Sequence, residues 1–359
     1  MEKFPWDVSK LLAEAGLLGL TLSPEDGGAG GTLTDAILAI LAVAEVCPRS
    51  GDVIQAGNFG AIRTFAEYAT KQQKERFLPR LLNGEEVMAV GMTEPEAGSA
   101  VTELSTTADK CSGGYLINGT KIFGTHSNEA ALFLIYVRFA PGAGGIGSVI
   151  VERDAPDFHI GKPIRFMNGE RWSELHFDNC KIPDENILLG IGGLKKQLSG
   201  FNIERLGNAA RSLAVGTHAF NIAKTYAKER RQFGRALCEF QGLQWKFSEV
   251  LLRLDSAGLL LMRAAAQAEN GLPSRYDTAL AKLACNEAGF QAANEALQIF
   301  GGHGFSEDSI VQYCFKKTRG WMIAGGSVEI LKNIIAEEIF DRRFPQYPAE
   351  PSAKSGVLS

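Results

Sequence analysis

The chain has 359 residues, of which 45% are hydrophobic and 22% are charged, and its formal net charge is −4. These values describe a globular protein of two or three domains, and the interspersed charges give no reason to expect nucleic acid as the main partner. No apolar run reaches the roughly 18 residues that a membrane-spanning helix needs, and the N-terminus lacks the apolar core of a signal peptide, so we expect no membrane partner.

Residues 1–88 are predicted to form an N-terminal helical domain. LLAEAGLLGL at 11–20 and DAILAILAVAEV at 35–46 carry apolar residues at a spacing of three to four, which is typical of helices with one buried face. The intervening SPEDGGAGGTLTDA predicts a turn, with Thr34 as the cap of the second helix. A third helix is expected in KQQKERFLPRLLNG, ending at the Asn-Gly pair 83–84.

The composition changes over residues 89–194, which are predicted to form a middle β domain. In GYLINGTKIF, Asn118 and Gly119 lie between two apolar runs, and this pattern predicts a hairpin with a type I′ turn. Three more short β-rich runs follow, separated by Gly, Pro and Asn: ALFLIYVRF, GSVIVERD and ELHFDNCKI. The zone is therefore expected to be a compact β domain.

Residues 195–345 return to helical patterns and are predicted to form a C-terminal bundle. One apolar stripe runs along CEFQGLQWKFSEVLLRLDSAG, and similar helices on either side favour an antiparallel arrangement. Residues 346–359 are rich in proline and serine and are expected to form a loose tail. The stripe consists of Phe240, Leu243, Phe247, Val250, Leu251 and Leu254.

The six cysteines are scattered singly, without the CxxC spacing of a metal site. Free thiols in a reducing compartment explain this pattern most simply. We therefore expect a cytoplasmic protein with no metal site. The cysteines are Cys47, Cys111, Cys180, Cys238, Cys285 and Cys314.

Two stretches of the β zone have the residues to contact a bound group. In GMTEPEAGSA, the exposed backbone with Thr93 and Ser99 could donate to carbonyls or phosphates, although a plain loop has the same composition. In KIFGTHSN, Phe123 and Thr125 would lie on one face of an extended segment and could flank a flat ring. Packing in the β core is the alternative for this second pair.

Two stretches of the helical zone are similarly open to two interpretations. KERRQFGR closes a helix with three arginines that could bind a pyrophosphate, or that simply form a solvated helix end. In LQIFGGHGFSED, Gln298 precedes three glycines as a helix ends, which is also the pattern of a C-terminal cap. Nearer the C-terminus, the adjacent Gly325 and Gly326 of GWMIAGGSVEIL suggest backbone brought close to a bound group.

Taken in order, TEPEAGSA, INGTKIF, ERRQFG, QIFGGHGF and GGSVEI resemble the acyl-CoA dehydrogenase family of flavoproteins over nearly the whole chain. The resemblance implies an α+β multidomain fold with an N-terminal helical domain, a middle β-barrel and a C-terminal four-helix bundle. It also implies bound FAD, a homotetramer or dimer, and oxidation of the Cα–Cβ bond of an acyl-CoA thioester. Electron-transferring flavoprotein is the implied electron acceptor.

The resemblance assigns roles to individual positions. Val90, Met92 and Thr93 match residues that contact the isoalloxazine ring, and Phe123 and Thr125 match the wall against that ring. Ser99 and Arg205 match residues that contact the thioester substrate. Residues that match FAD contacts across a subunit interface, or near the adenine end, are Arg230, Phe233, Gln298, Gly302, Ser327 and Glu329.

The family reaction needs a carboxylate that removes the α-proton of the thioester. Many members carry it where this chain has Gly325, which cannot act as a base but whose N–H could stabilise the enolate-like transition state. A second family solution places the glutamate on the first bundle helix, and the matching residue in FNIERLGNAA is Glu204. Without the resemblance, Glu204 would be interpreted as a favourable partner of the helix dipole.

Several departures leave more than one activity open. EPEAGSA, EFQGLQW and IAGGSVEIL resemble most the branch that includes acyl-CoA desulfinases, which cleave a C–S bond while retaining FAD. The base position of that branch can be glutamine, so Glu204 favours the dehydrogenase. Its substrate arginine would fall near Asp52, with Arg49 close but out of register. The chain could also act on a carrier-protein thioester, or serve as a partner subunit to an active homologue.

Overall fold

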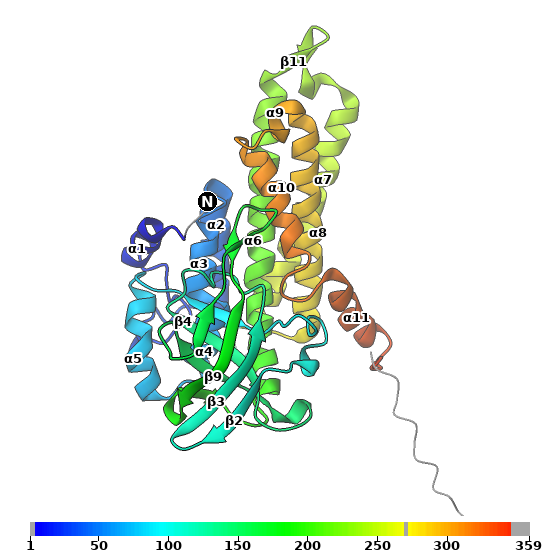
Figure 1. Cartoon of the computed structure of the whole chain (residues 1–359). Coiled ribbons are helices and arrows are strands. Elements are labelled where there is room, and N and C mark those ends of the chain that lie inside the picture. Colours follow the sequence, from blue (N-terminus) through cyan, green and yellow to red (C-terminus); the bar gives the residue numbers. More distant parts are fainter. Residues whose placement is uncertain (1–3, 269–271, 346–359) are drawn as a thin grey trace, which may run out of the picture.

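Figure 1 shows the computed structural model, which describes residues 4–268 and 272–345. The N-terminal helices and the twisted sheet lie beside the lower half of a tall helical bundle. Along the chain, the helices, the sheet and the bundle follow one another in the order expected from the sequence. The loose tail predicted for residues 346–359 lies outside the described residues. Within the described ranges, no helix combines the length and the apolar character needed to cross a membrane.

The N-terminal zone contains short helices that end at capping residues. The second helix is capped by Thr32, whose hydroxyl accepts from the N–H of Asp35 while the Asp35 carboxylate accepts from the N–H of Thr32. The prediction of Thr34 was therefore wrong by two residues, because the reciprocal cap lies at Thr32. The helices are α1 (Trp6–Glu14), α2 (Leu33–Val46), α3 (Gly51–Asn58), α4 (Gly60–Tyr68) and α5 (Lys71–Leu82).

The middle zone is one eight-stranded sheet with the order β10-β5-β4-β2-β3-β9-β6, and β1 pairs in parallel with β4. Within the described residues this pairing is an open path, so the closed barrel expected from the resemblance is not confirmed. The strands are β1 (Met88–Gly91), β2 (Thr107–Cys111), β3 (Gly114–Lys121), β4 (Leu132–Arg138), β5 (Ile146–Glu152), β6 (Phe158–Ile160), β9 (Leu175–Pro183) and β10 (Ile187–Leu189). A separate ribbon joins β7 (Ile164–Arg165) to β8 (Arg171–Trp172).

The hairpin predicted at Asn118 and Gly119 lies elsewhere. β2 and β3 are joined at Ser112 and Gly113, and the Asn-Gly pair continues within β3. The register between β3 and β9 shifts next to Gly119, which has φ +147°. A Cβ at this position would lie 2.5 Å from the Thr106 hydroxyl oxygen, so the glycine serves a bulge and a close approach instead of a turn.

The C-terminal zone is built on α6 (Leu194–Glu229), α7 (Gln241–Ala266), α8 (Arg275–Phe300) and α10 (Ile310–Trp321), with α9 (Gly302–Phe305) and α11 (Val328–Ile339) attached. α6 and α8 approach closely where Gly216 faces Gly289, because a Cβ on Gly216 would lie 2.5 Å from the Gly289 Cα. The stripe predicted on α7 is confirmed at Val250 and Leu254, which are buried, whereas Leu251 is 45% exposed.

The long helix α6 connects all three zones. It packs against α2, α3 and α4 of the N-terminal helices, against β5 of the sheet, and against α7, α8 and α10 of the bundle. Side chains on one face of α6 therefore reach both the N-terminal helices and the segment that follows α10. This junction holds the residues considered next.

Candidate active site

The segment from 322 to 327, between α10 and α11, has a backbone that requires glycine. Gly325 and Gly326 have φ values of +72° and +92°, a region that residues with a Cβ rarely adopt. Two cations hold this loop by its carbonyls. Arg205 on α6 donates to Gly325 O at 3.1 Å, and Lys282 on α8 donates to Gly326 O at 3.0 Å and to Trp321 O at 3.2 Å.

Glu204 lies one residue before Arg205 and is held from the N-terminal helices. Gln55 Nε2 on α3 donates to Glu204 Oε2 at 2.6 Å, and Arg211, two turns further along α6, places a guanidinium nitrogen 3.8 Å from Glu204 Oε1. Gly60 lies against the same carboxylate, because a Cβ there would be 2.8 Å from Glu204 Oε2. The carboxylate is thus fixed by contacts from α3, α4 and α6.

A side chain at position 325 would point toward α6 and α8. A Cβ built on Gly325 would lie 3.4 Å from Lys282 Cε and 3.8 Å from Asn208 Nδ2. Asn208 is one helical turn after Glu204 and therefore lies on the same face of α6. The direction of a side chain at 325 consequently leads toward the face of α6 that carries Glu204.

Burial dominates the electrostatics of this region. Burial raises the pKa of Glu204, while Arg211, the hydrogen bond from Gln55 and the charge of Lys282 act in the opposite direction. The Lys282 side chain is fully buried, and burial beside Arg205 lowers its pKa to about 7. An acid that is protonated more easily than usual thus lies beside a lysine that is deprotonated more easily than usual.

A buried ion network extends from Glu204 along α6. Arg211 donates to Asp52 Oδ1 at 2.9 Å, and Lys317 on α10 lies 2.7 Å from Asp52 Oδ2 and pairs with Glu170 as well. Despite burial, the two cations hold the pKa of Asp52 below its usual value. The aromatic face of Trp321 lies 5.0 Å from the Arg211 guanidinium, which places this network against the end of α10.

The residues predicted to contact the isoalloxazine ring lie together. Val90, Met92 and Thr93 follow one another at the end of β1, and Phe123 and Thr125 follow β3. A hydrogen bond of 2.9 Å from Ile122 N to Thr93 O joins the two segments. Phe123 is held at φ +60° and is 57% exposed, and its ring meets the Phe166 ring edge to face at 6.0 Å.

A buried ion pair, which sequence reasoning missed, fixes these two segments. Glu94 is 3% exposed and accepts from Lys121 Nζ at 2.6 Å and from the N–H groups of Ser105 and Thr106 at 2.5 and 3.0 Å. These contacts lower the pKa of Glu94 to about 2 despite its burial. A glutamate within the TEPEAGSA motif and a lysine within INGTKIF were visible in the sequence, but nothing there paired them.

The remaining predicted cofactor residues lie elsewhere. Arg230 and Phe233 border the ribbon of β11 (Arg231–Gln232) and β12 (Arg235–Ala236), and Phe233 is 94% exposed with φ +51°. Figure 1 shows this ribbon and α9 at the end of the bundle that is remote from the sheet. Gly302 is the first residue of α9, and Gln298 lies in the last turn of α8, just before it. One protomer therefore does not bring them to Phe123.

The four remaining predicted residues are Ser327 and Glu329, which follow the glycine loop, Arg205, which holds that loop, and Ser99 of the GMTEPEAGSA stretch. Ser327 precedes the first residue of α11, and its hydrogen bond lowers the pKa of the exposed Glu329. Ser99 is exposed, in the loop that follows β1. Arg205, which was predicted to bind substrate, donates a hydrogen bond to the Gly325 carbonyl of the loop.

Profiles of the acyl-CoA dehydrogenase family match three successive parts of the chain: its N-terminal domain over residues 1–85, its middle domain over 89–180 and its C-terminal domain over 192–340. The chain belongs to the acyl-CoA dehydrogenase family. It is 33% identical over 344 residues to the short-chain-specific acyl-CoA dehydrogenase of Clostridium acetobutylicum, covering 94% of this chain and 91% of that one. It is 34% identical over 357 residues to the 3-sulfinopropanoyl-CoA desulfinase of Cupriavidus necator, covering 96% and 90%.

Solved structures of this acyl-CoA dehydrogenase family agree with the fold. Butyryl-CoA dehydrogenase from Megasphaera elsdenii superposes with a TM-score of 0.88 at 29% identity, covering 94% of this chain and 91% of that one. An FAD complex of PigA superposes with a TM-score of 0.87 at 26% identity, covering 94% and 90%. The predicted family resemblance is thereby confirmed.

Five residues around Glu204 were absent from the sequence predictions. A sequence signal was available for two of them, because spacings of four and seven place Asn208 and Arg211 on the helix face of Glu204. The other three come from segments far away in the chain, which no local pattern connects to this carboxylate. The five are Gln55, Gly60, Asn208, Arg211 and Lys282.

Proposed function

We propose that this chain is an FAD-dependent acyl-CoA dehydrogenase in which Glu204 removes the α-proton of the thioester. The observation that carries the proposal is that a Cβ at position 325 would point toward Asn208, which lies one turn from Glu204 on α6. A base on α6 can act at the point where family members with a glutamate in the loop would present theirs. The raised pKa of Glu204 suits a general base, because a carboxylate with an ordinary pKa accepts protons weakly near neutrality.

The chain has the residues to hold FAD, which when bound supplies the acceptor for the hydride from the β-carbon. The exposed ring of Phe123 and the backbone of Val90–Thr93 offer a flat face with hydrogen-bonding edges. Gly124 permits the close approach of these segments, because a Cβ there would lie 3.1 Å from Val90 O. We propose that Ser327 and Glu329 contact the adenine end of FAD.

Each protein group has a distinct role in the proposed reaction. Glu204 takes the proton, and Gln55 orients its carboxylate through the 2.6 Å hydrogen bond. The N–H of Gly325 is proposed to donate to the thioester carbonyl and to stabilise the negative charge that develops on that oxygen. Arg205 and Lys282 hold the carbonyls of the loop, so that this N–H keeps its direction.

The far ends of the bundle support a proposal about assembly. Arg230, Phe233, Gln298 and Gly302 lie remote from Phe123 in one protomer. We therefore propose that a neighbouring subunit of a homotetramer or dimer supplies them to the pyrophosphate and adenine of FAD. Ser99 is proposed to contact the CoA arm of the substrate in its own subunit, and electron-transferring flavoprotein is the proposed acceptor of the electrons.

A C–S lyase of the desulfinase type is the second candidate, and the 34% identity to the Cupriavidus necator desulfinase favours it. Such an enzyme would retain FAD but need no base. The half-buried, oriented carboxylate of Glu204 favours dehydrogenation instead, because partly desolvating a carboxylate costs free energy that a lyase without a base would not need to spend.

Anaerobic titration of the purified protein with short, branched, aromatic and dicarboxylic acyl-CoAs tests the proposal, with visible flavin absorbance as the signal. Bleaching by one class supports dehydrogenation and names the substrate. A flavin that stays oxidised with every thioester, including carrier-protein thioesters, contradicts it. Sulfite release from a 3-sulfinoacyl thioester would then support the lyase.

A further inference from the structure

Arg211 on α6 lies between two carboxylates but forms a hydrogen bond with only one of them. Its Nη1 donates to Asp52 Oδ1 at 2.9 Å, whereas its Nη2 lies 3.8 Å from Glu204 Oε1, beyond hydrogen-bond distance. The side chain is 9% exposed, and its Nε has no hydrogen-bond partner among the described residues. The guanidinium therefore has donor groups that Asp52 does not use, yet it does not close the contact with Glu204.

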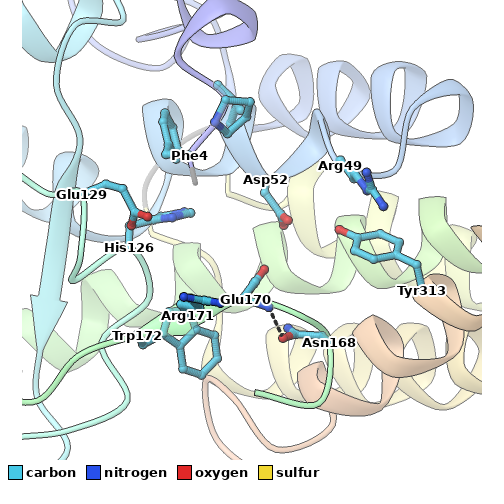
Figure 2. Close-up of a pocket in the computed structure, with 12 residues that line it drawn as sticks. Phe4, Arg49, Asp52, His126, Glu129, Asn168, Glu170, Arg171, Trp172 and Tyr313 are labelled. Atoms are coloured by element: carbon cyan, nitrogen blue, oxygen red, sulfur yellow. Dashed lines mark hydrogen bonds between the residues drawn. The ribbon is translucent and has the colours of Figure 1, made fainter. Parts of the chain in front are cut away.

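Asp52 on α3 is held by a cation at each oxygen. Lys317 on α10 lies 2.7 Å from Asp52 Oδ2 and is 4% exposed, while Arg211 occupies Oδ1. Lys317 also pairs with Glu170, and Figure 2 shows the Asp52 carboxylate directed from its helix toward Glu170. Burial alone would raise the pKa of Asp52, but the two cations hold it below its usual value, so Asp52 stays ionised near neutral pH. Arg211 thus always has a charged acceptor.

The same helix also holds the other oxygen of Glu204. Gln55 follows Asp52 by three residues, which places it on the same face of α3, and it donates to Glu204 Oε2 at 2.6 Å. The helix α3 therefore fixes one oxygen of the proposed base directly. Through Asp52, it also fixes the cation that lies nearest to the second oxygen.

A closed ion pair between Arg211 and Glu204 would oppose proton abstraction. An arginine at hydrogen-bond distance favours the ionised form of a carboxylate and lowers its pKa by about 1–3. A carboxylate with a lower pKa is a weaker base and removes the α-proton more slowly. Burial raises the pKa of Glu204 and the charge of Arg211 opposes this, so the distance between the two side chains decides how basic Glu204 is.

We propose that Asp52 is a positioning residue, which holds Arg211 at a distance from Glu204 and thereby leaves this carboxylate free to accept a proton. The inference rests on the proposed function, because it takes Glu204 as the base. The same ion pairs could instead serve only to tie α3, α6 and α10 together. That use makes no demand on the distance from Arg211 to Glu204, so the two interpretations differ in what neutralising Asp52 does to Glu204.

Two cations face Glu204, and only one of them is held by Asp52. Arg211 comes from α6 and Lys282 from α8, whereas α3 and α4 contribute an amide and a glycine. The neighbouring Arg205 donates to the loop between α10 and α11. Burial lowers the pKa of Lys282 to about 7, so this lysine changes its charge near neutral pH. Lys282 is therefore kept in every variant, and variants are compared at equal pH.

The groups around Asp52 line a cavity of about 60 Å³ with it. Burial lowers the pKa of His126 to about 4 and raises that of Tyr313, so both are uncharged near neutral pH. Burial raises the pKa of Glu129 as well, and Arg49 lies 5.0 Å from the Tyr313 ring. Within the described residues, none of these four groups pairs with Arg211, so none could hold the guanidinium in place of Asp52.

The first experiment follows the protonation of Glu204 in the FAD-loaded protein without substrate. Infrared spectra resolve the carbonyl stretch of protonated carboxyl groups, and subtracting the spectrum of Glu204→Gln in the same background isolates Glu204. We expect Asp52→Asn to lower the midpoint pH of this band by about 1 or more, because the released guanidinium closes on the carboxylate. Asp52→Ser removes the acceptor as well as the charge and should lower the midpoint at least as far. Unchanged midpoints would overturn the inference.

A double-mutant cycle separates the release of Arg211 from the loss of a negative charge. Neutralising Asp52 lowers the pKa of a neighbouring acid by itself, since one anion fewer repels the ionised form. In an Arg211→Gln background, however, Asp52→Asn has no guanidinium to release. We expect the effect of Asp52→Asn on the midpoint to fall there to less than about a third. Equal effects in the two backgrounds would show that Arg211 does not carry the effect, and would overturn the inference.

The second readout is flavin reduction by a thioester that reduces the wild type. In Asp52→Asn the acid limb of the rate should move to lower pH, and the plateau rate should fall about tenfold, because the base is weaker. Glu170→Gln is the matched control, since it removes an acid that pairs with Lys317 but not with Arg211. Retained flavin absorbance shows that each variant is folded. An equal shift of the limb in Glu170→Gln would assign the effect to the network as a whole and overturn the role of Asp52.

The two proposals fail separately in this design. If no thioester reduces the wild-type flavin, the dehydrogenase is contradicted, whereas the infrared cycle still supports or overturns the control of Arg211 by Asp52. If a thioester reduces the flavin while the midpoint of Glu204 does not respond to Asp52→Asn, the proposed function is supported and the positioning role is overturned.

Discussion

Glu204 accepts a hydrogen bond of 2.6 Å from Gln55, a residue 149 positions earlier in the chain. The loop opposite Glu204 is held by Arg205 and Lys282, from α6 and α8. The carboxylate is therefore oriented from the N-terminal helices, and the loop from the bundle. The geometry between the two depends on how the N-terminal helices pack on α6.

Glu204→Gln should keep the fold and bound FAD but reduce the rate of flavin reduction by about 10²–10⁴-fold, because general-base catalysis contributes this much. In the wild type, the rate should fall as pH drops through the raised pKa of Glu204, since only the ionised form accepts the α-proton. Stopped-flow absorbance under anaerobic conditions measures both. Glu329→Gln is the control, and a wild-type rate in Glu204→Gln would show that another group is the base.

Gly60→Ala should displace the carboxylate of Glu204 while leaving Glu204 itself in place. The new Cβ would lie 2.8 Å from Glu204 Oε2, and the position has φ +62°, which costs roughly 1 kcal/mol for a residue with a side chain. Gly16→Ala is a matched control, because Gly16 has φ +70° and open space around it. Thermal unfolding should show a similar stability loss for both variants. Only Gly60→Ala should slow flavin reduction, and equal rates would argue against a fixed position of the Glu204 carboxylate.

Lys282→Met should alter both the loop and the pH profile. Loss of the ammonium leaves Gly326 O and Trp321 O without this donor and removes a positive charge that lowers the pKa of Glu204. The acid limb of the rate profile should therefore move to higher pH, a change that mere destabilisation would not cause. Lys332→Met on the exposed face of α11 is the control. An unshifted limb would show that Lys282 has no electrostatic effect on the base.

The wild type should also gain stability between pH 7 and 10. Folding lowers the pKa of Lys282 to about 7 from its usual 10.5. In this window the unfolded chain binds a proton at this lysine that the folded chain does not, so the free energy of unfolding rises with pH. Urea unfolding at several pH values should show a positive slope that is smaller in Lys282→Met. Equal slopes would contradict an effect of this lysine on stability.

Glu94→Gln should destabilise the two segments that carry Thr93 and Phe123. Lys121 would lose its partner and would have to keep a buried charge uncompensated or release its proton, because burial already lowers its pKa to about 8; breaking such a pair costs about 3–5 kcal/mol. Because folding lowers the pKa of Glu94 to about 2 from 4.5, its contribution is complete above about pH 4.5 and is lost as the pH falls toward 2. Acid unfolding in the wild type and in Glu94→Gln measures the difference. Adding Lys121→Met to Glu94→Gln should restore part of the stability. If it restores none, the two residues do not stabilise the fold as a pair.

Local patterns predicted the elements of this fold better than their contacts. The helix predicted in KQQKERFLPRLLNG is α5, which ends at Leu82 with Asn83 as its C-cap, because its period and its closing Asn-Gly pair are properties of the sequence itself. The helices α3 and α4, which precede it, were not predicted from the sequence. The turn predicted at Asn118 and Gly119 was wrong, because an Asn-Gly pair suits a bulge as well as a turn. Only the proximity of Thr106, from another part of the chain, decides between the two. The same holds for the candidate site. Glu204 was predicted from a local motif, whereas Gln55 and Lys282 were not predicted because they lie on helices distant in the sequence.

The proposed proximity of positions 204 and 325 can be tested by moving the carboxylate. A Cβ on Gly325 meets Lys282 Cε at 3.4 Å, an ordinary contact, so Gly325→Glu should fold and retain FAD at a cost of about 1 kcal/mol for its φ of +72°. Combined with Glu204→Gln, it should restore flavin reduction at least tenfold over Glu204→Gln alone, because the new carboxylate extends toward the same face of α6. Gly325→Gln in the same background is the control and should restore nothing. If the Glu204→Gln/Gly325→Glu protein keeps its FAD but gains no rate, the two positions do not present a base to one common point.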